Sequence, residues 1–282
     1  MRILLTGRNG QVGWELERAL APLGAVMATD RSTLDVADPE AIRRVVRETR
    51  PETIVNAAAY TAVDRAESDA ETAMRVNGIA AGVFAEEAQR IGALLVHYST
   101  DYVFDGDKGA PYVEDDATNP LSVYGCTKLE GERRIQASGC RHLVLRTGWV
   151  YAPRGHNFLL TVLRLARDGK ALRIVADQTG SPTAAQDVAE ATAAILARDA
   201  VATGTFHLCA QGEASWYDFA REILAMTGRL ETPLTRIATS EYPAAARRPR
   251  YSVLSTEKIR RALGISLPGW RASLAIACRA LG

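Results

Sequence analysis

Short, continuously apolar runs alternate with amphipathic segments along most of the chain. A run without polar residues at every second position is typical of a parallel strand that is covered on both faces. We predict strands over residues 2–5, 25–29, 53–56, 94–98, 142–146, 172–175 and 205–208. Strands that alternate with helices in this way form a parallel sheet with helices on both faces.

The segment that follows the second strand carries clear helix signals. Asp38 provides an N-cap, Pro39 occupies the first turn and Glu40 makes that turn acidic. An apolar stripe over residues 42–46 follows, and Pro51 ends the helix. Further helices are predicted over residues 11–20, 124–135, 158–167, 216–226 and 256–263.

These elements predict an α/β protein with a Rossmann-type doubly wound parallel sheet and right-handed crossovers. The regular alternation loosens after residue 150, and residues 151–157 and 232–251 are predicted to be loops. We expect a first domain over residues 1–150, with strands near 172–208 rejoining its sheet. Residues 151–282 are expected to form mostly a smaller C-terminal lobe, interleaved with that sheet.

Composition narrows the class of protein. Of the 282 residues, 47% are hydrophobic and 24% are charged, as in globular proteins and unlike disordered chains. The formal net charge of +1 argues against binding to nucleic acid through bulk positive charge. The four cysteines form no C-x-x-C pair, so we expect neither a metal site nor disulfides. We find no signal peptide and no apolar run of about 18 residues, and expect a cytoplasmic protein without membrane contact.

Candidate chemistry begins directly after the first strand, where Gly7, Gly10 and Gly13 open the helix over residues 11–20. Glycines at this spacing let the chain turn tightly and let backbone N–H groups approach a pyrophosphate at the positive end of the helix. An ordinary glycine-rich turn is the alternative. The position of the motif after the first of several strands favours a dinucleotide site.

The end of the second strand bears on the choice of dinucleotide. Asp30 lies there, and an acidic side chain at this point accepts hydrogen bonds from the adenosine ribose. Arg31 follows it and Arg8 lies in the glycine turn, and either would meet a 2′-phosphate. The sequence therefore leaves NADH and NADPH open as cofactors.

A second motif is Y-x-x-x-K at Tyr124 and Lys128, in a segment with helical spacing. Residues four apart lie on one face of a helix. An ammonium beside a phenol favours the phenolate, so we expect Lys128 to lower the pKa of Tyr124 from its usual value of ~10. Such a phenol donates or accepts a proton when a carbonyl and an alcohol interconvert. A pair on a solvated helix face is the alternative.

A third feature is the strand over residues 94–98, which runs directly into Ser99, Thr100 and Asp101. Open α/β sheets bind their ligands at the carboxyl ends of the strands. Thr100 would there hydrogen-bond the oxygen that Tyr124 protonates, although a simple Ser/Thr turn is the other interpretation. Three motifs in this order favour a dinucleotide-dependent oxidoreductase.

These motifs resemble those of the extended short-chain dehydrogenase/reductase superfamily, which combines a glycine turn, a Ser/Thr and Y-x-x-x-K. Within it, the chain is similar to the dTDP-4-dehydrorhamnose reductase family over nearly its whole length. The similarity fades after Ala210 and returns at Arg248. It is carried by TGRNGQVGWEL (6–16), VNAAAYTAVDRAE (55–67), HYSTDYVFDG (97–106), NPLSVYGCTKLEGE (119–132), RTGWVYA (146–152), NFLLTVLRLA (157–166) and DQTGSPT (177–183).

The resemblance implies the reduction of dTDP-6-deoxy-L-lyxo-4-hexulose to dTDP-L-rhamnose by NADH or NADPH, the last step in making this activated sugar. It implies Thr100, Tyr124 and Lys128 as the catalytic set. Around the dinucleotide it implies Gly7, Gly10, Gln11, Val12, Gly13, Asp30, Asp35, Val36, Ala58, Ala59, Tyr60, Tyr124 and Lys128. Around the nucleotide sugar it implies Thr100, Asp101, Tyr124, Trp149, Asn157 and Arg248.

Some of these residues have a second interpretation. Trp149 packs either on a sugar ring or in the core, and Arg248 either binds a diphosphate or belongs to a solvated basic loop. Asn77, in a helix that is otherwise apolar, either orders the active-site backbone or occupies a packing defect.

The resemblance also bears on metal and assembly. Some members of the family form a dimer around a magnesium ion that is held by glutamates of two subunits. Glu15 is present here, but Gln186 stands at the second position. We therefore expect no metal, and a monomer or a different homodimer.

Two other functions fit part of the pattern. A nucleotide-sugar epimerase or 4,6-dehydratase shares the motifs, although dehydratases carry an acid where Tyr102 stands. A non-catalytic regulatory subunit, such as the β subunit of methionine adenosyltransferase, resembles the same fold. The intact catalytic set favours an enzyme, although the fold alone does not decide.

Overall fold

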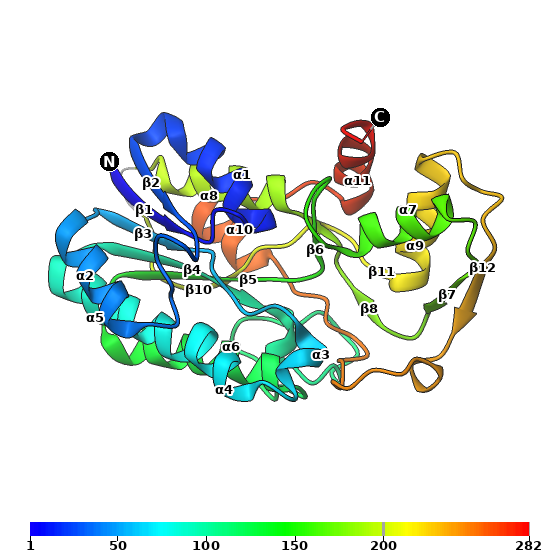
Figure 1. Cartoon of the computed structure of the whole chain (residues 1–282), viewed down its shortest axis with the longest axis horizontal. Coiled ribbons are helices and arrows are strands. Elements are labelled where there is room, and N and C mark those ends of the chain that lie inside the picture. The colour runs from blue at the N-terminus through cyan, green and yellow to red at the C-terminus, as the bar shows by residue number, and fades with distance from the viewer. Residues whose placement is uncertain (199–200, 282) are drawn as a thin grey trace.

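A six-stranded parallel sheet forms the centre of the larger part of the molecule (Figure 1). The computed structural model describes residues 1–198 and 201–281. The strands lie in the order β10-β5-β4-β3-β1-β2 and all pair in parallel. Their bounds are β1 Arg2–Thr6, β2 Ala25–Thr29, β3 Thr53–Asn56, β4 Leu94–Thr100, β5 His142–Thr147 and β10 Gly204–His207.

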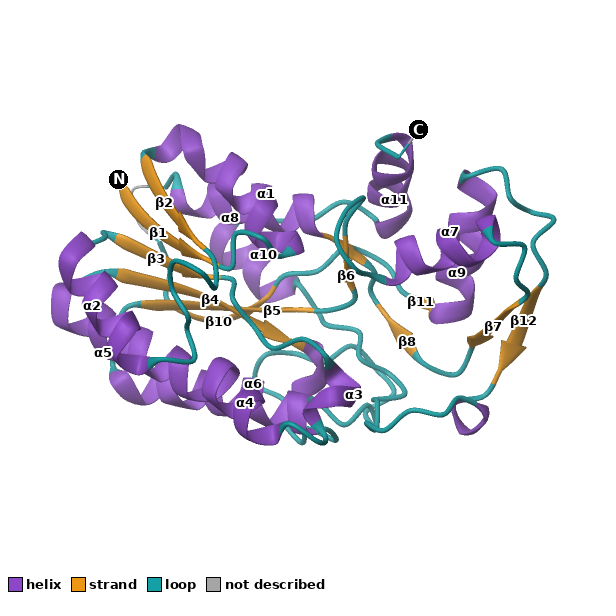
Figure 2. Cartoon of the chain, viewed as in Figure 1, coloured by secondary structure: helices purple, strands orange, loops and turns teal. Residues whose placement is uncertain are grey.

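Helices cover both faces of this sheet (Figure 2). Along β1, Ile3 and Leu5 pack with α1, α8 and α10, whereas Leu4 packs with α2 and α5. Both sets of strand residues are therefore buried, which explains the continuously apolar runs. The Rossmann-type doubly wound fold is confirmed. The helices are α1 Gln11–Leu20, α2 Pro39–Thr49, α5 Ala80–Ile91, α6 Val123–Ser138, α8 Ala185–Leu196 and α10 Glu257–Leu263.

Shorter helical elements connect β3 to α5, and others follow α1, β4 and β12. One of them, η2, is a π-helix that runs without a break into α5. Among the described residues, no helix is long and apolar enough to cross a membrane. The short elements are η1 Ala21–Leu23, α3 Val63–Ala66, α4 Ala70–Met74, η2 Arg75–Ile79, η3 Asp101–Val103 and η4 Thr239–Glu241.

A smaller lobe follows β5 and has its own apolar core around Phe219 and Trp270 (Figure 1). Its helices come together with three two-stranded sheets, which pair β8 with β11, β7 with β12 and β6 with β9. The elements are β6 Val150–Tyr151, α7 Phe158–Arg167, β7 Leu172–Val175, β8 Thr179–Gly180, β9 Thr183–Ala184, β11 Ala214–Ser215, α9 Trp216–Met226, β12 Leu234–Ile237 and α11 Trp270–Arg279.

Two predictions about this part of the chain are wrong. Strand β7 does not rejoin the central sheet as β10 does, but pairs with β12 in the smaller lobe. The reason is visible in its burial, because Arg173 is exposed between buried Leu172 and Val175, and a central parallel strand has no exposed face. The residues predicted as a continuous loop, 232–251, contain β12. The domain boundary at residue 150 stays a prediction.

The order of the strands fixes where a ligand can bind. Strand β1 has β2 on one side and β3 on the other, so the direction of winding reverses beside it. A crevice opens at such a point, outside the carboxyl ends of the strands. The turns after β1, β3, β4 and β5 all leave the sheet at this end, because the strands are parallel.

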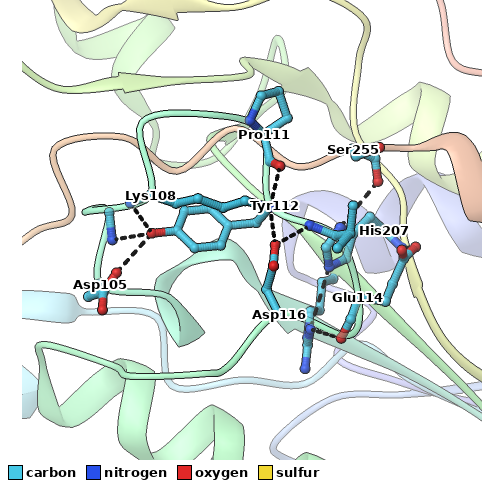
Figure 3. Close-up of polar contacts among 11 residues, drawn as sticks. Asp105, Lys108, Pro111, Tyr112, Glu114, Asp116, His207 and Ser255 are labelled. Carbon is cyan, nitrogen blue, oxygen red and sulfur yellow. Dashed lines mark hydrogen bonds and ion pairs between the residues drawn. The ribbon is translucent and has the colours of Figure 1, made fainter.

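Polar contacts hold the long connection between β4 and α6 in place (Figure 3). Tyr112 Oη donates to Asp105 Oδ1 over 2.8 Å within this connection. The backbone N–H of His207 on β10 donates to Glu114 Oε1 over 2.8 Å, which ties the connection to the edge of the sheet. The middle of the connection is therefore held both by contacts within it and by a contact to the edge strand β10.

Candidate active site

A cavity of about 990 Å³ lies at the carboxyl ends of β1, β3, β4 and β5, where the sheet meets the smaller lobe. Its lining includes Gly7 after β1, Thr100 at the end of β4, Tyr124 and Lys128 on α6, and Trp216 at the start of α9. All the predicted site residues line it except Gly13, which is buried in α1. The sheet topology thus brings together motifs that lie far apart in the sequence.

The turn after β1 needs glycines because other backbone atoms lie close to Gly7 and Gly13. Gly7 has a φ of 73°, and a Cβ on it would lie 2.7 Å from the Ala58 backbone nitrogen. A Cβ on Gly13 would lie 2.0 Å from the Gly7 carbonyl oxygen, so Gly13 acts through packing rather than through contact with the cavity. Helix α1 begins after Gly10 without a side-chain cap, which leaves backbone N–H groups available to an anion.

The cavity wall beyond this turn carries Asp30. Its carboxylate accepts hydrogen bonds from Ser32 and from Asn9 Nδ2, and those from Ser32 contribute most to lowering its pKa to about 2. Arg31 also lines the cavity and is exposed, whereas Arg8 pairs with Glu17 over 2.8 Å. Arg31 Nε lies 3.9 Å from Asp35 Oδ2, so of the two arginines considered for a 2′-phosphate, Arg31 has the looser carboxylate partner.

Asn77 orders the backbone that follows β3. Its Oδ1 accepts from the Tyr60 backbone N–H over 2.9 Å, and its Nδ2 donates to the Tyr60 carbonyl oxygen over 3.1 Å. The same Nδ2 donates to Thr127 Oγ1 on α6 over 3.0 Å. The side chain lies in the π-helix η2, a distortion that is frequent at functional sites. Of the two interpretations of Asn77, the structure favours the ordering of cavity backbone.

Tyr124 and Thr100 both line the cavity. Ser122 caps α6 by accepting from the Gly125 N–H, which places Tyr124 in the first turn of the helix. Burial raises the pKa of Tyr124 to about 12, against a lowering by its hydrogen bond with Thr100. The phenol therefore carries its proton at neutral pH, the form that a proton donor needs.

Lys128 is fully buried and is held from the strand side. Its Nζ donates to the Tyr98 carbonyl oxygen over 2.5 Å and lies 3.2 Å from His97 Nε2. Burial lowers the pKa of Lys128 to about 8, while Glu132 acts in the opposite direction. The prediction that Lys128 lowers the pKa of Tyr124 is wrong, because the ammonium is bound to the strand and not to the phenol.

Asp101 places a further titratable group in the cavity. It is buried, and its Oδ1 accepts from Thr100 Oγ1 over 3.0 Å. Burial raises the pKa of this carboxyl to about 6. The hydroxyls of Ser99 and Thr147 also belong to residues of the lining, and both oxygens are buried without a hydrogen-bond partner. Unsatisfied polar atoms of this kind fit a ligand that carries several hydroxyl groups.

The smaller lobe contributes an aromatic wall that the sequence revealed only in part. Trp149 has a φ of 51°, and its indole stacks on that of Trp216. Trp216 was predicted only as the start of a helix, and no sequence signal placed it beside Trp149. The Nε1 of Trp216 donates to Gln178 Oε1 over 3.2 Å, which fixes the orientation of the pair.

Asn157 and Arg248, both predicted to face the substrate, have protein partners. Asn157 caps α7 and donates to Gln11 Oε1 over 2.8 Å, so it joins the smaller lobe to the glycine turn. The guanidinium of Arg248 binds the Asp64 carboxylate through two contacts of 2.6 and 3.1 Å. Arg248 lines the cavity and its side chain is mostly covered, although most residues around it in the loop are exposed.

The residues considered for a shared magnesium ion do not form a site within this chain. Gln186 Nε2 donates to Glu190 Oε1 over 2.8 Å, and burial raises the pKa of Glu15. The described residues contain no group of three or more His, Cys, Asp or Glu side chains placed to hold a metal. The absence of a metal from the mechanism stays a prediction.

The fold and this cavity define a dinucleotide-dependent oxidoreductase of the short-chain dehydrogenase/reductase type, since the glycine turn, the strand-end threonine and the Tyr-x-x-x-Lys pair share one crevice. The family model described as RmlD substrate binding domain matches residues 1–281. The chain is 48% identical to a dTDP-4-dehydrorhamnose reductase of Burkholderia thailandensis, in an alignment that covers 100% of this chain and 99% of that protein. It therefore belongs to the dTDP-4-dehydrorhamnose reductase family.

Solved structures agree with this assignment. A dTDP-4-dehydrorhamnose reductase of Clostridium acetobutylicum superposes with a TM-score of 0.95 at 38% identity and covers 100% of this chain and 99% of that one. A dTDP-4-dehydrorhamnose reductase of Bacillus anthracis, solved in complex with NADP, has a TM-score of 0.94 at 34% identity, with 99% of each chain covered.

Proposed function

We propose that this protein reduces dTDP-6-deoxy-L-lyxo-4-hexulose to dTDP-L-rhamnose with NADPH or NADH. The observation that carries the proposal is the convergence of Thr100, Tyr124 and Lys128 on the cavity that the glycine turn opens. Family membership supports the choice of substrate. When bound, the reduced nicotinamide supplies a hydride to carbon 4 of the sugar.

Side chains of the protein donate the proton, polarise the carbonyl and bind the cofactor. Tyr124, which burial keeps protonated, donates its phenolic proton to the oxygen at carbon 4. Thr100 hydrogen-bonds the same oxygen and polarises the carbonyl. Lys128 is mostly charged at neutral pH and would bind the nicotinamide ribose.

The two parts of the molecule hold the two substrates face to face. The glycine turn and α1 take the pyrophosphate of the dinucleotide, and Asp30 with Arg31 faces the adenosine ribose. Asp101 and Trp149 contact the hexose, and the segment with Arg248 faces the nucleotide diphosphate. In our proposal Arg248 keeps one bond to Asp64 and turns the other N–H groups to the phosphates.

Location and assembly complete the proposal. We place the protein in the cytoplasm as a monomer or homodimer, without nucleic-acid or membrane partners. The four cysteines are free, which supports a reducing compartment, and the described chain has no membrane-spanning helix.

The experiment combines purified protein, the dTDP-4-keto sugar and either NADPH or NADH. We expect loss of the reduced-nicotinamide absorbance in a one-to-one ratio with the formation of dTDP-L-rhamnose, identified by mass spectrometry and NMR. Conversion of the sugar without net consumption of cofactor would overturn the proposal in favour of an epimerase or dehydratase. Absence of turnover, with tight capture of another protein, would favour a regulatory subunit.

A further inference from the structure

His97 links Lys128 to a chain of polar side chains that crosses the sheet. The ring Nδ1 of His97 on β4 lies 3.1 Å from Asn56 Nδ2 on β3. Asn56 Oδ1 in turn accepts from Thr6 Oγ1 on β1 over 2.7 Å. On the other side of the ring, Nε2 lies 3.2 Å from Lys128 Nζ. All four side chains are buried, and His97 does not line the cavity.

The chemistry of these groups ties the proton on His97 to the charge on Lys128. Burial, with Lys128 next in importance, holds the pKa of His97 well below 6.5, so the ring is neutral and carries one N–H. A charged Lys128 has only donors, so His97 Nε2 must accept and Nδ1 must carry the ring proton. This state requires the Asn56 side-chain amide to turn its oxygen toward Nδ1 and its nitrogen toward Thr6 Oγ1, the reverse of the arrangement above. With a neutral Lys128 both bonds are reversed: Nε2 donates to Nζ, and Asn56 Nδ2 donates to Nδ1.

We propose that His97 is a positioning residue for Lys128. Its Nε2 and the Tyr98 carbonyl oxygen accept two of the three N–H groups of the ammonium, and the third is left for an acceptor in the cavity. The inference rests on the function proposed above, in which Lys128 acts as an ammonium beside Tyr124. Without the imidazole, the buried charge loses one of its two acceptors, and the neutral amine becomes more favourable.

Other titratable groups around Lys128 do not replace this contact. Glu132, one turn further along α6, favours the charged form but is engaged by the guanidinium of Arg146 over 2.7 Å. Tyr124 and Asp101 line the cavity without a hydrogen bond to Lys128 Nζ among the described contacts. The contacts of the ammonium on the strand side are therefore His97 and Tyr98.

Two substitutions of nearly equal length separate positioning from simple packing. His97→Gln keeps an amide oxygen near the position of Nε2, whereas His97→Met fills the space without an acceptor for Lys128. We expect the alkaline limb of the kcat/KM profile to move down by about one to two pH units in His97→Met, the value of a hydrogen bond to a charged group. In His97→Gln the alkaline limb should move down by no more than about half of that shift, because the amide oxygen still accepts from Lys128.

His207→Met is the matched control, because His207 is another fully buried histidine of the same sheet without a contact to Lys128. It should lower thermal stability without moving the alkaline limb. A folded His97→Met protein whose pH profile equals that of the wild type would overturn the inference. Equal loss of kcat in the Met and Gln variants with unshifted limbs would also overturn it, since that result indicates packing alone.

If His97→Met fails to fold, a measurement on the wild-type protein tests whether His97 accepts from Lys128. In protein with ¹⁵N-labelled histidine, His97 should carry its proton on Nδ1 at neutral pH and on Nε2 above the pH at which Lys128 loses its charge. A proton on Nε2 throughout would contradict the inference. This readout needs no turnover, so it distinguishes failure of the inference from failure of the proposed reaction.

Discussion

The indole rings of Trp149 and Trp216 lie parallel, with 3.4 Å between their centroids and 3° between their planes. Trp149 follows β5 of the central sheet and Trp216 begins α9 of the smaller lobe, so the stack joins the two parts beside the cavity. The left-handed backbone of Trp149 is unfavourable for a bulky residue, by about 1–3 kcal/mol. Strain of this kind persists where the position of a side chain matters for function.

Gly180 makes room for this stack, and its substitution is our first prediction. A Cβ on Gly180 would lie 2.3 Å from Cε2 of Trp149, so Gly180→Ala must displace the indole. We expect a KM for the nucleotide sugar at least about tenfold higher, equivalent to about 1.4 kcal/mol of binding, with an unchanged Kd for NADPH. Steady-state kinetics with both substrates varied would measure it.

The matched control is Gly269→Ala in the same lobe. Gly269 has ordinary backbone angles, and its added Cβ would lie 3.9 Å from the nearest atom. The control should behave as the wild type does. A Gly180→Ala enzyme with an unchanged KM for the sugar would show that the position of Trp149 does not serve substrate binding.

The second prediction concerns the choice between the two dinucleotides. Arg31 is exposed on the cavity wall, where its guanidinium can meet a 2′-phosphate, whereas NADH offers only a hydroxyl there. Arg31→Ala should weaken NADPH binding by about tenfold or more, the value of a lost charge-assisted hydrogen bond, and leave the Kd of NADH unchanged. Titration of nicotinamide fluorescence measures both constants.

The control is Arg44→Ala. Arg44 is also exposed, but it lies on α2 and does not line the cavity. If Arg31→Ala raises the Kd of NADPH and of NADH equally, Arg31 does not bind the 2′-phosphate. The Asp30 carboxylate, an acceptor with a pKa of about 2, would then be the main determinant of which dinucleotide binds.

The sequence predicted the elements whose pattern is local. The strands of the central sheet were predicted to within two residues at their ends, because burial on both faces demands uninterrupted apolar residues. Strand β12, Leu234–Ile237, was missed because its two middle residues are exposed and it pairs with β7, an equally short strand. Such pairs depend on tertiary contacts that periodicity does not record.

The residues predicted for the site lie around one cavity, but the sequence did not predict their electrostatics. The spacing of Tyr124 and Lys128 correctly placed both on one helix beside the cavity. The spacing gave no sign that His97 and the Tyr98 carbonyl would hold the ammonium, since that contact crosses from α6 to β4. Trp216 was missed for the same reason, because its partner lies in another part of the chain.

The third prediction follows from the burial of His207. Its ring lies against Arg146, with Nε2 3.5 Å from Nη1, and Nδ1 lies 3.2 Å from the Ser255 carbonyl oxygen. Burial, and then the charge of Arg146, lower the pKa of His207 to about 3. The unfolded chain therefore binds a proton near pH 6.5 that the folded chain does not bind until about pH 3.

Stability from this group is present above pH 6.5 and is lost as the pH falls toward 3, with a slope of about 1.4 kcal/mol per pH unit. We expect His207→Asn to be less stable at pH 7 but to lose less free energy of unfolding between pH 6.5 and 4.5. Urea denaturation across this range measures the difference between the two proteins. Parallel curves for variant and wild type would contradict the prediction. The opposite contribution of Asp101, whose pKa is raised, is present in both proteins and cancels.

The most direct test of the account is hydride transfer in a single turnover of Tyr124→Phe. The variant keeps the ring and loses only the proton donor, so the melting temperature and the Kd of NADPH should stay as in the wild type. Rapid mixing of the NADPH complex with dTDP-6-deoxy-L-lyxo-4-hexulose should show oxidation slower by about 10²–10⁴-fold, the usual value of general acid catalysis. Oxidation at a rate within a few fold of the wild type would contradict the assignment of Tyr124 as the proton donor.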